Sequence, residues 1–324
     1  MRRVSLMLIV VVLISACVKE ARVTLPEEGS PFLVVSHLKD PALTFVDPHT
    51  YEVVQTVPLE EAWQKMIQVN DAYLWALQKQ SGVLQQLAKK EGVLTPLTDV
   101  GSGFSDVAFS EERNRVYVAD PKTGQVHRID PQTKSLEVSI EVAGVPDELL
   151  LSGDDRLFVL DVSACKVSEI DLNKEAVTRT FTVEDRATGL FFDGQWLWIG
   201  GHGAIGELNK SVYAYDVRTG EQVAEVEVGL MPIATIASAD GHSLYVVSHG
   251  DAHLYEIDRE AQQVTRTVRV GQNPNYIYRR DGALYVSNVD SDSISIIDEA
   301  TFTVKKEVPV AGGPHAMLME EWHE

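Results

Sequence analysis

The sequence has little cysteine: Cys17 and Cys165 are the only two in 324 residues. A small disulfide-stapled domain is therefore excluded, because such domains carry several cysteine pairs. The chain needs no staples, since 324 residues with 44% hydrophobic content can bury a sizeable core. The same content excludes general disorder, and the length fits either two domains or one large all-β domain.

Basic residues are also scarce, with 28 Lys and Arg against 48 Asp and Glu, a net charge of -20. An acidic surface repels phosphate backbones, so we expect no nucleic-acid partner. Common catalytic and haem motifs are missing too: the sequence has no Gly-x-Ser-x-Gly, no His-Glu-x-x-His and no Cys-x-x-Cys-His. These absences favour a binding module over an enzyme of those classes.

The first residues predict an export signal. Arg2 and Arg3 precede an apolar run from Leu6 to Ile14, which is too short for a spanning helix and predicts a signal peptide over 1–16. The stretch Leu13-Ile14-Ser15-Ala16-Cys17 resembles the lipobox of bacterial lipoproteins, which implies cleavage before Cys17 and lipid on that cysteine. The alternative is an ordinary signal peptide with a chance cysteine.

The lipid would make the membrane a partner and hold the protein outside the cytoplasm, on the outer membrane if the host has two membranes. Residues 17–31 are mostly polar, contain two prolines and predict a flexible tether. With Cys17 lipidated, Cys165 has no partner for an internal disulfide. It is expected to act as a small buried hydrophobe rather than as a nucleophile.

The rest of the chain is an internal repeat. Strand-like motifs begin at Val116, Leu157, Leu197, Leu244 and Leu284, with separations of 41, 40, 47 and 40 residues. Phe32-Leu33-Val34 and the stretch around Leu74-Trp75 extend the series to seven copies. An aspartate followed by turn residues marks the same period, at Asp47, Asp130, Asp171, Asp216, Asp258 and Asp298.

Each period therefore holds four short strands, which predicts an all-β fold: a seven-bladed β-propeller of four-stranded antiparallel blades over 32–320. The period-two alternation excludes helical repeats. The C-terminal strand, beginning near Gly313-Pro314, is expected to complete the N-terminal blade and close the ring. Residues 321–324 are then a tail, and we expect a monomer.

The repeat resembles the YVTN-type (surface-layer-like) β-propeller family. The resemblance rests on Gly271–Pro274, on Asp281-Gly282-Ala283-Leu284-Tyr285-Val286-Ser287-Asn288 and on Asp292-Ser293-Ile294-Ser295-Ile296-Ile297-Asp298. It covers 32–318 and implies the fold, but its motif residues are structural. The copy at 63–97 departs most from the pattern.

Antiparallel order places the loops between strands two and three, and the loops leading into each blade, at one end of the propeller, here called end X. The opposite end is end Y. Aligning the residues after strand two places His37, His202 and His249 at one repeat position of end X, and His315 follows Pro314 at the start of a first strand. The full set of candidate ligand-binding residues at end X is His37, His202, His249, His315, Asp147, Asp251 and Asn275.

Three interpretations of this set stay open. It is a divalent-metal site with His202, His249 and His315 as candidate ligands, a mouth for a polar ligand without metal, or a structural set. No other cofactor is predicted. An insertion over 200–210, the cause of the 47-residue separation, falls at the same end, where binding loops tend to lie.

The favoured function is a lipid-anchored module in the cell envelope that binds an envelope protein or a small polar ligand through end X. One alternative is a lyase or hydrolase with His249 or His315 as base, supported by Asp147 or Asp251. Another is a subunit that supports a redox partner.

Overall fold

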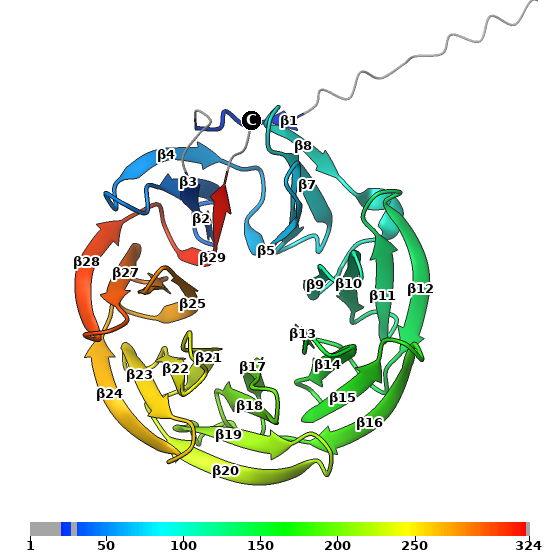
Figure 1. Ribbon diagram of the computed structural model, residues 1–324. Helices are drawn as coiled ribbons and strands as arrows, with labels where there is room; N and C mark the ends of the chain where they lie inside the picture. The colour runs from blue at the N-terminus through cyan, green and yellow to red at the C-terminus, as the bar shows by residue number, and fades with distance from the viewer. Residues whose placement is uncertain (1–20, 27–30, 322–324) are drawn as a thin grey trace, which may run out of the picture.

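Short antiparallel strands separated by tight turns make up almost all of the chain in the computed structural model, which describes residues 21–26 and 31–321. They form seven sheets arranged in a ring around a central axis (Figure 1). The predicted seven-bladed propeller is therefore confirmed. The predicted signal peptide and Cys17 lie outside the described residues.

Each blade has four strands that follow one another from the central axis to the rim, with one further strand on blade 2. From inner to outer strand the blades are β29 (Pro314–Glu321), β2 (Pro31–His37), β3 (Ala42–Val46), β4 (Val53–Pro58) in blade 1; β5 (Trp63–Asn70), β6 (Tyr73–Gln78), β7 (Leu84–Ala88), β8 (Val93–Pro96) in blade 2; β9 (Asp106–Ser110), β10 (Arg115–Asp120), β11 (Gln125–Asp130), β12 (Ser135–Glu141) in blade 3; β13 (Glu148–Leu151), β14 (Arg156–Asp161), β15 (Lys166–Asp171), β16 (Ala176–Thr182) in blade 4; β17 (Ala187–Phe192), β18 (Trp196–Gly201), β19 (Ser211–Asp216), β20 (Glu221–Glu227) in blade 5; β21 (Pro232–Ala237), β22 (Ser243–Ser248), β23 (His253–Asp258), β24 (Gln263–Arg269) in blade 6; and β25 (Pro274–Arg280), β26 (Ala283–Asn288), β27 (Ser293–Asp298), β28 (Thr303–Pro309) in blade 7.

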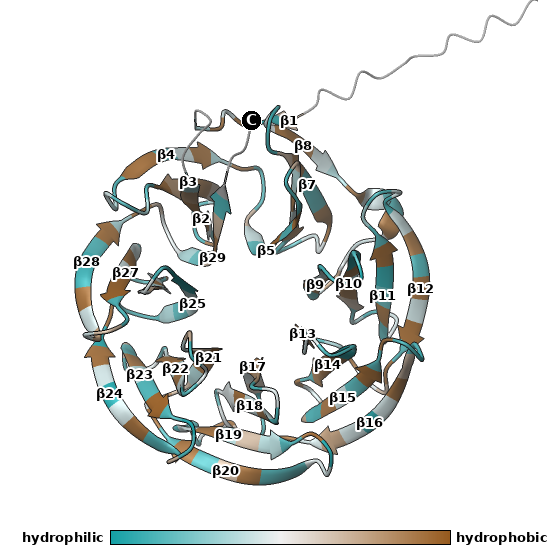
Figure 2. Cartoon of the chain, in the orientation of Figure 1, coloured by the Kyte–Doolittle hydropathy of each residue, from teal (hydrophilic) through white to brown (hydrophobic). Residues whose placement is uncertain are grey.

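Burial follows strand position within the blade. Second strands are buried almost throughout, as in β14 and β26, because neighbouring blades pack on both of their faces. Outer strands are mostly exposed, with buried or half-buried residues only in their second halves. Figure 2 shows that polar and apolar residues alternate along β20, β24 and β28. The apolar clusters lie mostly between blades; one joins Tyr117 of blade 3 to Leu157 and Leu172 of blade 4.

The aspartates that mark the repeat lie at the end of a third strand or, for Asp47, directly after it, and they cap the turn that follows. The backbone N–H of His49 donates to Asp47 Oδ1 at 2.7 Å, and that of Gln132 donates to Asp130 Oδ1 at 2.7 Å. The residue four positions after each aspartate has a positive φ, as at Lys134 (φ 55) and Gly220 (φ 75). These are Asx turns, which explains why Asp recurs there.

Residues 21–26 differ from the predicted flexible tether. β1 (Ala21–Arg22) pairs antiparallel with β8 as a fifth strand of blade 2 (Figure 1). Val23 is buried, and Leu25 packs against the same apolar cluster between blades 1 and 2. Apolar residues at a spacing of two thus fix to the propeller a stretch whose polar composition predicted a tether. Among the described residues, no helix is long and apolar enough to cross a membrane.

Ring closure is achieved by β29, which pairs antiparallel with β2, from Pro31 opposite Glu321 to His37 opposite Pro314. The pairing confirms that the C-terminal strand completes the N-terminal blade. A buried ion pair supports it: Lys89 of blade 2 contacts Glu320 of β29, and their side chains are 4% and 0% exposed. Burial raises the pKa of Glu320, and the bond to Lys89 acts in the opposite direction.

We predict that Glu320→Gln destabilises the protein by about 3–5 kcal/mol, because it removes one charge of a buried ion pair. Urea denaturation measures the loss. The double variant Lys89→Met/Glu320→Leu is the control, because removing both charges together costs much less. A Glu320→Gln protein with the parent's midpoint would show that the pair does not support closure.

Candidate functional site

All seven blades contribute to one pocket of about 440 Å³ at the end X mouth of the central channel. Its walls are the first residues of the inner strands and the residues that follow second strands. The lining residues are Leu38, Gln64, Lys65, Lys79, Ser105, Asp106, Asp147, Glu148, Val162, Thr188, His202, Ile233, Asn275, Tyr276 and His315. Four of the predicted site residues, Asp147, His202, Asn275 and His315, are therefore brought together here.

Irregular pairing at the start of the inner strands exposes side chains to the channel. The register shifts by one residue between Pro232 and Ala234 and between Pro274 and Tyr276, so that Ile233 and Asn275 stand outside the ladder. A β-bulge of this kind turns the side chain of the extra residue away from its regular direction. This explains why the residue after each blade-initial proline lines the mouth.

The position after each second strand is defined by one repeated backbone hydrogen bond. The backbone N–H of His249 donates to the carbonyl of Met231, and the N–H of His202 donates to the carbonyl of Arg186. In blade 1 the N–H of Leu38 donates to the carbonyl of Gly313. In each pair the acceptor immediately precedes an inner strand. Leu38, not His37, is therefore the blade 1 counterpart of His202 and His249, and the three-histidine alignment was wrong by one residue.

A one-residue slip moves a side chain to the opposite face of its strand, and His37 shows the result. It is fully buried, with Nε2 hydrogen-bonded to Thr44 Oγ1 at 2.8 Å, and it lies outside the residues that line the pocket. The same pairing of residues seven apart joins Asn288 Nδ2 to Ser295 Oγ at 2.8 Å in blade 7. His37 therefore occupies a recurring position that ties second to third strands.

His202 and His249 meet between blades 5 and 6, with ring centroids 5.1 Å apart and an edge-on geometry. Burial lowers the pKa of both rings, and the charges of Arg186 on His202 and of His202 on His249 lower them further. His249 itself does not line the pocket. Both rings are therefore hydrogen-bonding groups without charge near neutral pH.

His315 lies on the wall of the mouth, edge-on to Tyr276 with centroids 6.0 Å apart. Burial lowers its pKa to about 4, with a smaller effect from Lys79. Its Nδ1 is buried and has no hydrogen-bond partner among the described residues. An uncharged imidazole with a free ring nitrogen suits it to hydrogen-bond a ligand, whereas a pKa near 4 makes it a weak base.

Charged side chains deeper in the mouth are paired. Lys65 Nζ, on a side chain 31% exposed, lies 2.7 Å from Asp106 Oδ1, on one 8% exposed. Burial is the largest single effect and lowers the pKa of Lys65, but the charge and hydrogen bond of Asp106, with smaller effects from Glu148 and Tyr276, together raise it. Glu148 accepts from the N–H groups of Gly189 at 3.1 Å and Leu190 at 3.0 Å. Its pKa is raised by burial and by Asp106.

The two predicted aspartates have partners within the protein. Asp147 Oδ2 accepts from the N–H of Val162 at 2.8 Å, and burial raises the pKa of Asp147. Asp251 is outside the pocket; its Oδ2 accepts from Tyr255 Oη at 2.6 Å, while its Oδ1 has no partner among the described residues. Asp147 thus faces the mouth, and Asp251 belongs to the loop beside His249.

Buried polar atoms without a partner are concentrated at end X. Within the described residues, eight of ten such atoms lie there, on His37, Ser248, His249, Asp251, Asn273, Ser287, Asn288 and His315. Buried polar atoms without a protein partner are satisfied by water or by a ligand. Of these eight residues, His315 lines the pocket and the others lie outside its lining.

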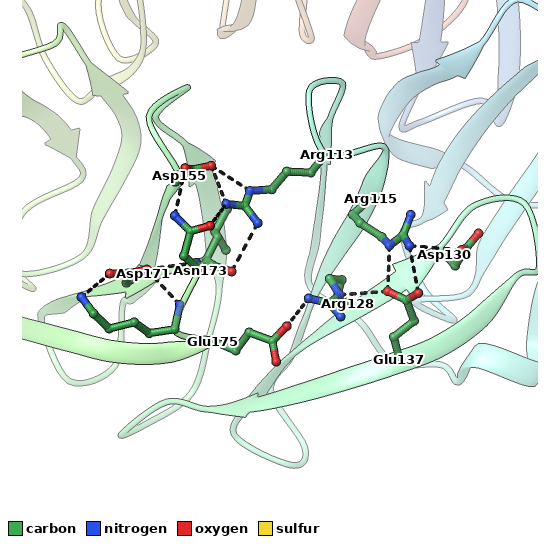
Figure 3. A network of polar contacts seen from close by, with 11 residues as sticks. Arg113, Arg115, Arg128, Asp130, Glu137, Asp155, Asp171, Asn173 and Glu175 are labelled. Carbon is green, nitrogen blue, oxygen red and sulfur yellow. Dashed lines mark hydrogen bonds and ion pairs between the residues drawn. The ribbon is translucent and has the colours of Figure 1, made fainter.

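End Y has the opposite character, and Figure 3 shows the example of blades 3 and 4. Arg113 Nε donates to Asp155 Oδ1 at 2.9 Å, and Arg115 and Arg128 share Glu137 at 2.7 and 2.9 Å. The polar groups of blades 3 and 4 at end Y therefore satisfy one another.

The inserted loop between β18 and β19 forms a second hollow at end X, of about 740 Å³. Asn209 holds it to the blade, because its N–H donates to the His202 carbonyl at 3.0 Å and its Nδ2 to that of Ser211 at 2.8 Å. Ile205 at the tip is 93% exposed. Glu184, Asp185 and Glu207 line the hollow.

The described part of the chain contains no set of side chains that would form the predicted metal site. No three His, Cys, Asp or Glu side chains within it are grouped so that they could hold an ion. His202 pairs with His249, whereas His315 faces Tyr276. Metal binding by these residues stays a prediction.

Sequence reasoning missed Lys65, Lys79, Asp106, Glu148 and Tyr276. Lys65, Asp106 and Glu148 are separated by 41 and 42 residues, which is the period of the repeat. That spacing could have identified them as inner-strand residues facing one axis. Lys79 follows the second strand of the most divergent copy, so its equivalence to His202 was obscured.

Comparisons with known proteins show the fold. No family model and no curated sequence matches the chain. Among solved structures, a functionally unknown protein from Desulfotomaculum acetoxidans is similar over 90% of this chain and 99% of that one, with TM-score 0.72 and 12% identity. Citrobacter koseri AztD matches 90% of this chain and 97% of its own at TM-score 0.61 and 11% identity.

A third match, Kuenenia stuttgartiensis hydrazine synthase, covers 79% of this chain and 89% of that chain at TM-score 0.68 and 16% identity. Identities this low establish shared architecture only, and such propellers serve diverse roles. The chain is thus a seven-bladed β-propeller with similar solved structures that differ in function.

We predict that His37→Asn flattens the loss of stability below pH 6.5. Burial holds the folded pKa of His37 at about 4 against an ordinary value of 6.5. The unfolded chain therefore binds the proton first, and stability falls as pH drops from 6.5 towards 4, by up to about 1.4 kcal/mol per pH unit for this group.

Asparagine is the matched replacement, because Asn288 makes the equivalent hydrogen bond in blade 7. Urea midpoints at pH 7 and pH 4.5 measure the effect. An unchanged difference between the two midpoints would contradict the assignment.

Proposed function

We propose that the protein is a lipid-anchored β-propeller of the cell envelope that binds a small polar ligand at the end X mouth of its channel. The supporting observation is the mouth itself, where side chains from all seven blades surround about 440 Å³. Among the lining groups, His315 Nδ1 is buried and has no hydrogen-bond partner among the described residues. A concave site with converging, uncommitted polar groups is typical of small-molecule binding.

The free groups indicate the character of the ligand. The carboxylates of Asp106, Asp147 and Glu148 already accept backbone N–H groups, and Lys65 neutralises Asp106. What remains is hydrogen-bonding capacity from amide, phenol and imidazole groups. This set suits a ligand rich in hydroxyl, amide or carboxylate groups.

Membership of the YVTN-type family and the lipid on Cys17 are parts of the same proposal. Both rest on sequence resemblance: the repeat motif best seen at Asp281–Asn288 and the stretch Ile14-Ser15-Ala16-Cys17. The anchor would place the binding site outside the cytoplasm, where small polar solutes and envelope proteins are the available partners.

Replacing the proposed lipid attachment site should release the protein from membranes. We expect Cys17→Ala to lose incorporation of labelled fatty acid and to move from the detergent phase to the aqueous phase, since acyl chains supply the membrane affinity. Cys165→Ser is the control and should partition like the parent. A Cys17→Ala protein that stays in the detergent phase would rule out this anchor.

Ligand binding at the mouth can be tested by thermal shift against a panel of monosaccharides, amino acids and dicarboxylates. A compound that raises the melting temperature of the parent should lose that effect in His202→Ala and Asn275→Ala. Because both residues are only partly buried, each variant should itself change stability by about 1 kcal/mol or less.

His242→Ala is the control, because this histidine is exposed on a turn at end Y. Equal shifts in all four proteins would place the compound elsewhere. Failure of the whole panel would contradict the small-ligand proposal.

A further inference from the structure

We infer that the mouth binds a small zwitterion, with the ligand ammonium at Asp147 and the ligand carboxylate at Lys79. The inference rests on the proposed function and names the class of ligand for that same site. The charged groups that line the mouth are unevenly placed: an acidic side lies on blades 3 and 4, and a basic side lies on blade 2 with His315 beside it.

The acidic side has more carboxylates than bound cations. Asp106, Asp147 and Glu148 all line it. Lys65 of β5 binds the first of these, with Nζ 2.7 Å from Asp106 Oδ1. Figure 1 shows the inner strands β5, β9 and β13 side by side around the axis. Within the described chain, neither Asp147 nor Glu148 forms an ion pair, so negative charge on this side is left uncompensated.

Asp147 is the carboxylate best placed to receive a ligand. Its Oδ2 accepts the N–H of Val162 at 2.8 Å, which leaves Oδ1 for a ligand. Burial and the charge of Asp161 raise the pKa of Asp147, and the Val162 hydrogen bond acts against them. A neutral N–H does not cancel the charge of a carboxylate. A ligand ammonium would supply both the cation and a charge-assisted hydrogen bond.

The basic side offers a lysine and a buried ring nitrogen. The N–H of Lys79 donates to the Ala62 carbonyl at 2.8 Å, while its side chain is exposed and pairs with no carboxylate among the described residues. After burial, the charge of Lys79 is what lowers the pKa of His315, so the two side chains are neighbours. His315 Nδ1 is buried without a partner in the same part of the chain. Lys79 Nζ and a protonated Nδ1 are donors suited to a carboxylate.

The remaining walls of the mouth limit the ligand further. Leu38, Val162 and Ile233 contribute apolar surface, and Asn275 contributes an amide. The volume of about 440 Å³ is that of a small-molecule site. An amino acid and a short peptide share the required chemistry, which is a free ammonium, a free carboxylate and a small apolar side chain.

Calorimetric titration of the purified protein with L-alanine, dialanine and trialanine tests the inference. The three probes keep both charges and differ in the distance between them, so the one that binds best separates a free amino acid from a peptide. N-acetylation of that probe should weaken binding at least about tenfold, because it removes the ammonium from a half-buried carboxylate. Conversion of its carboxylate to an amide should weaken binding about two- to fivefold, because Lys79 is exposed.

Two variants match these changes in the ligand. Asp147→Asn should weaken the unmodified probe as N-acetylation does, and should leave binding of the N-acetyl form unchanged. Lys79→Gln should act in the same way on the unmodified and amidated forms. Asparagine can still accept the Val162 N–H, so the urea midpoint of Asp147→Asn at pH 7 should equal or exceed that of the parent. Lys90→Gln and Asp99→Asn are the controls, because both residues are exposed and lie outside the lining.

Unmodified probes that bind both variants as tightly as the parent would overturn the inference, and so would capped probes that bind as tightly as uncapped ones. An uncharged sugar that binds the parent but not Asn275→Ala, with no binding of the alanine series, would also overturn it while leaving the proposed function intact. Absence of binding by every compound would contradict both.

Discussion

Closure of the ring by the β2–β29 pair is the constraint on which the rest of the structure depends. The ring has no single hydrophobic core, because its apolar clusters lie mostly between neighbouring blades. Each interface is complete only if both blades are held in place. The last strand must therefore pair with the second, and the buried contact of Lys89 with Glu320 ties that strand to the next blade. The mouth exists because closure brings seven inner strands to one axis.

The fold was predictable from sequence because its determinants are local and repeated. A strand motif and an Asx-turn aspartate recur about every 41 residues, and both have a direct structural cause. The same regularity located the mouth: Asp147, Asn275 and His315 follow from their place after each blade's opening residues. Even the divergent copy at 63–97 retained enough alternation to be placed.

The errors came where a single residue of register matters. The sequences Val34-Val35-Ser36-His37 and Val246-Val247-Ser248-His249 look alike. In the structure, however, His37 pairs with Pro314 at the start of β29, whereas Ser248 pairs with Pro232 at the start of β21. The sequence also could not show which side chains pair. Lys65 and Asp106 are 41 residues apart, and the ring brings Lys65 Nζ within 2.7 Å of Asp106 Oδ1. The contacts of Val23 with blade 2 depend on a surface that composition cannot show.

The closing strand has a consequence for how the chain folds. The Lys89–Glu320 contact spans 231 residues, whereas the four main strands of each of blades 2 to 7 are adjacent in sequence, and β1 of blade 2 comes earlier in the chain. Those six blades can form as the chain is synthesised, but the inner edge of β2 has no partner until the final residues arrive. Non-local pairing of this kind is slow, and an open strand edge invites pairing with other chains. Blade 1, first in sequence, is therefore the last to be completed and the one most exposed to misassembly.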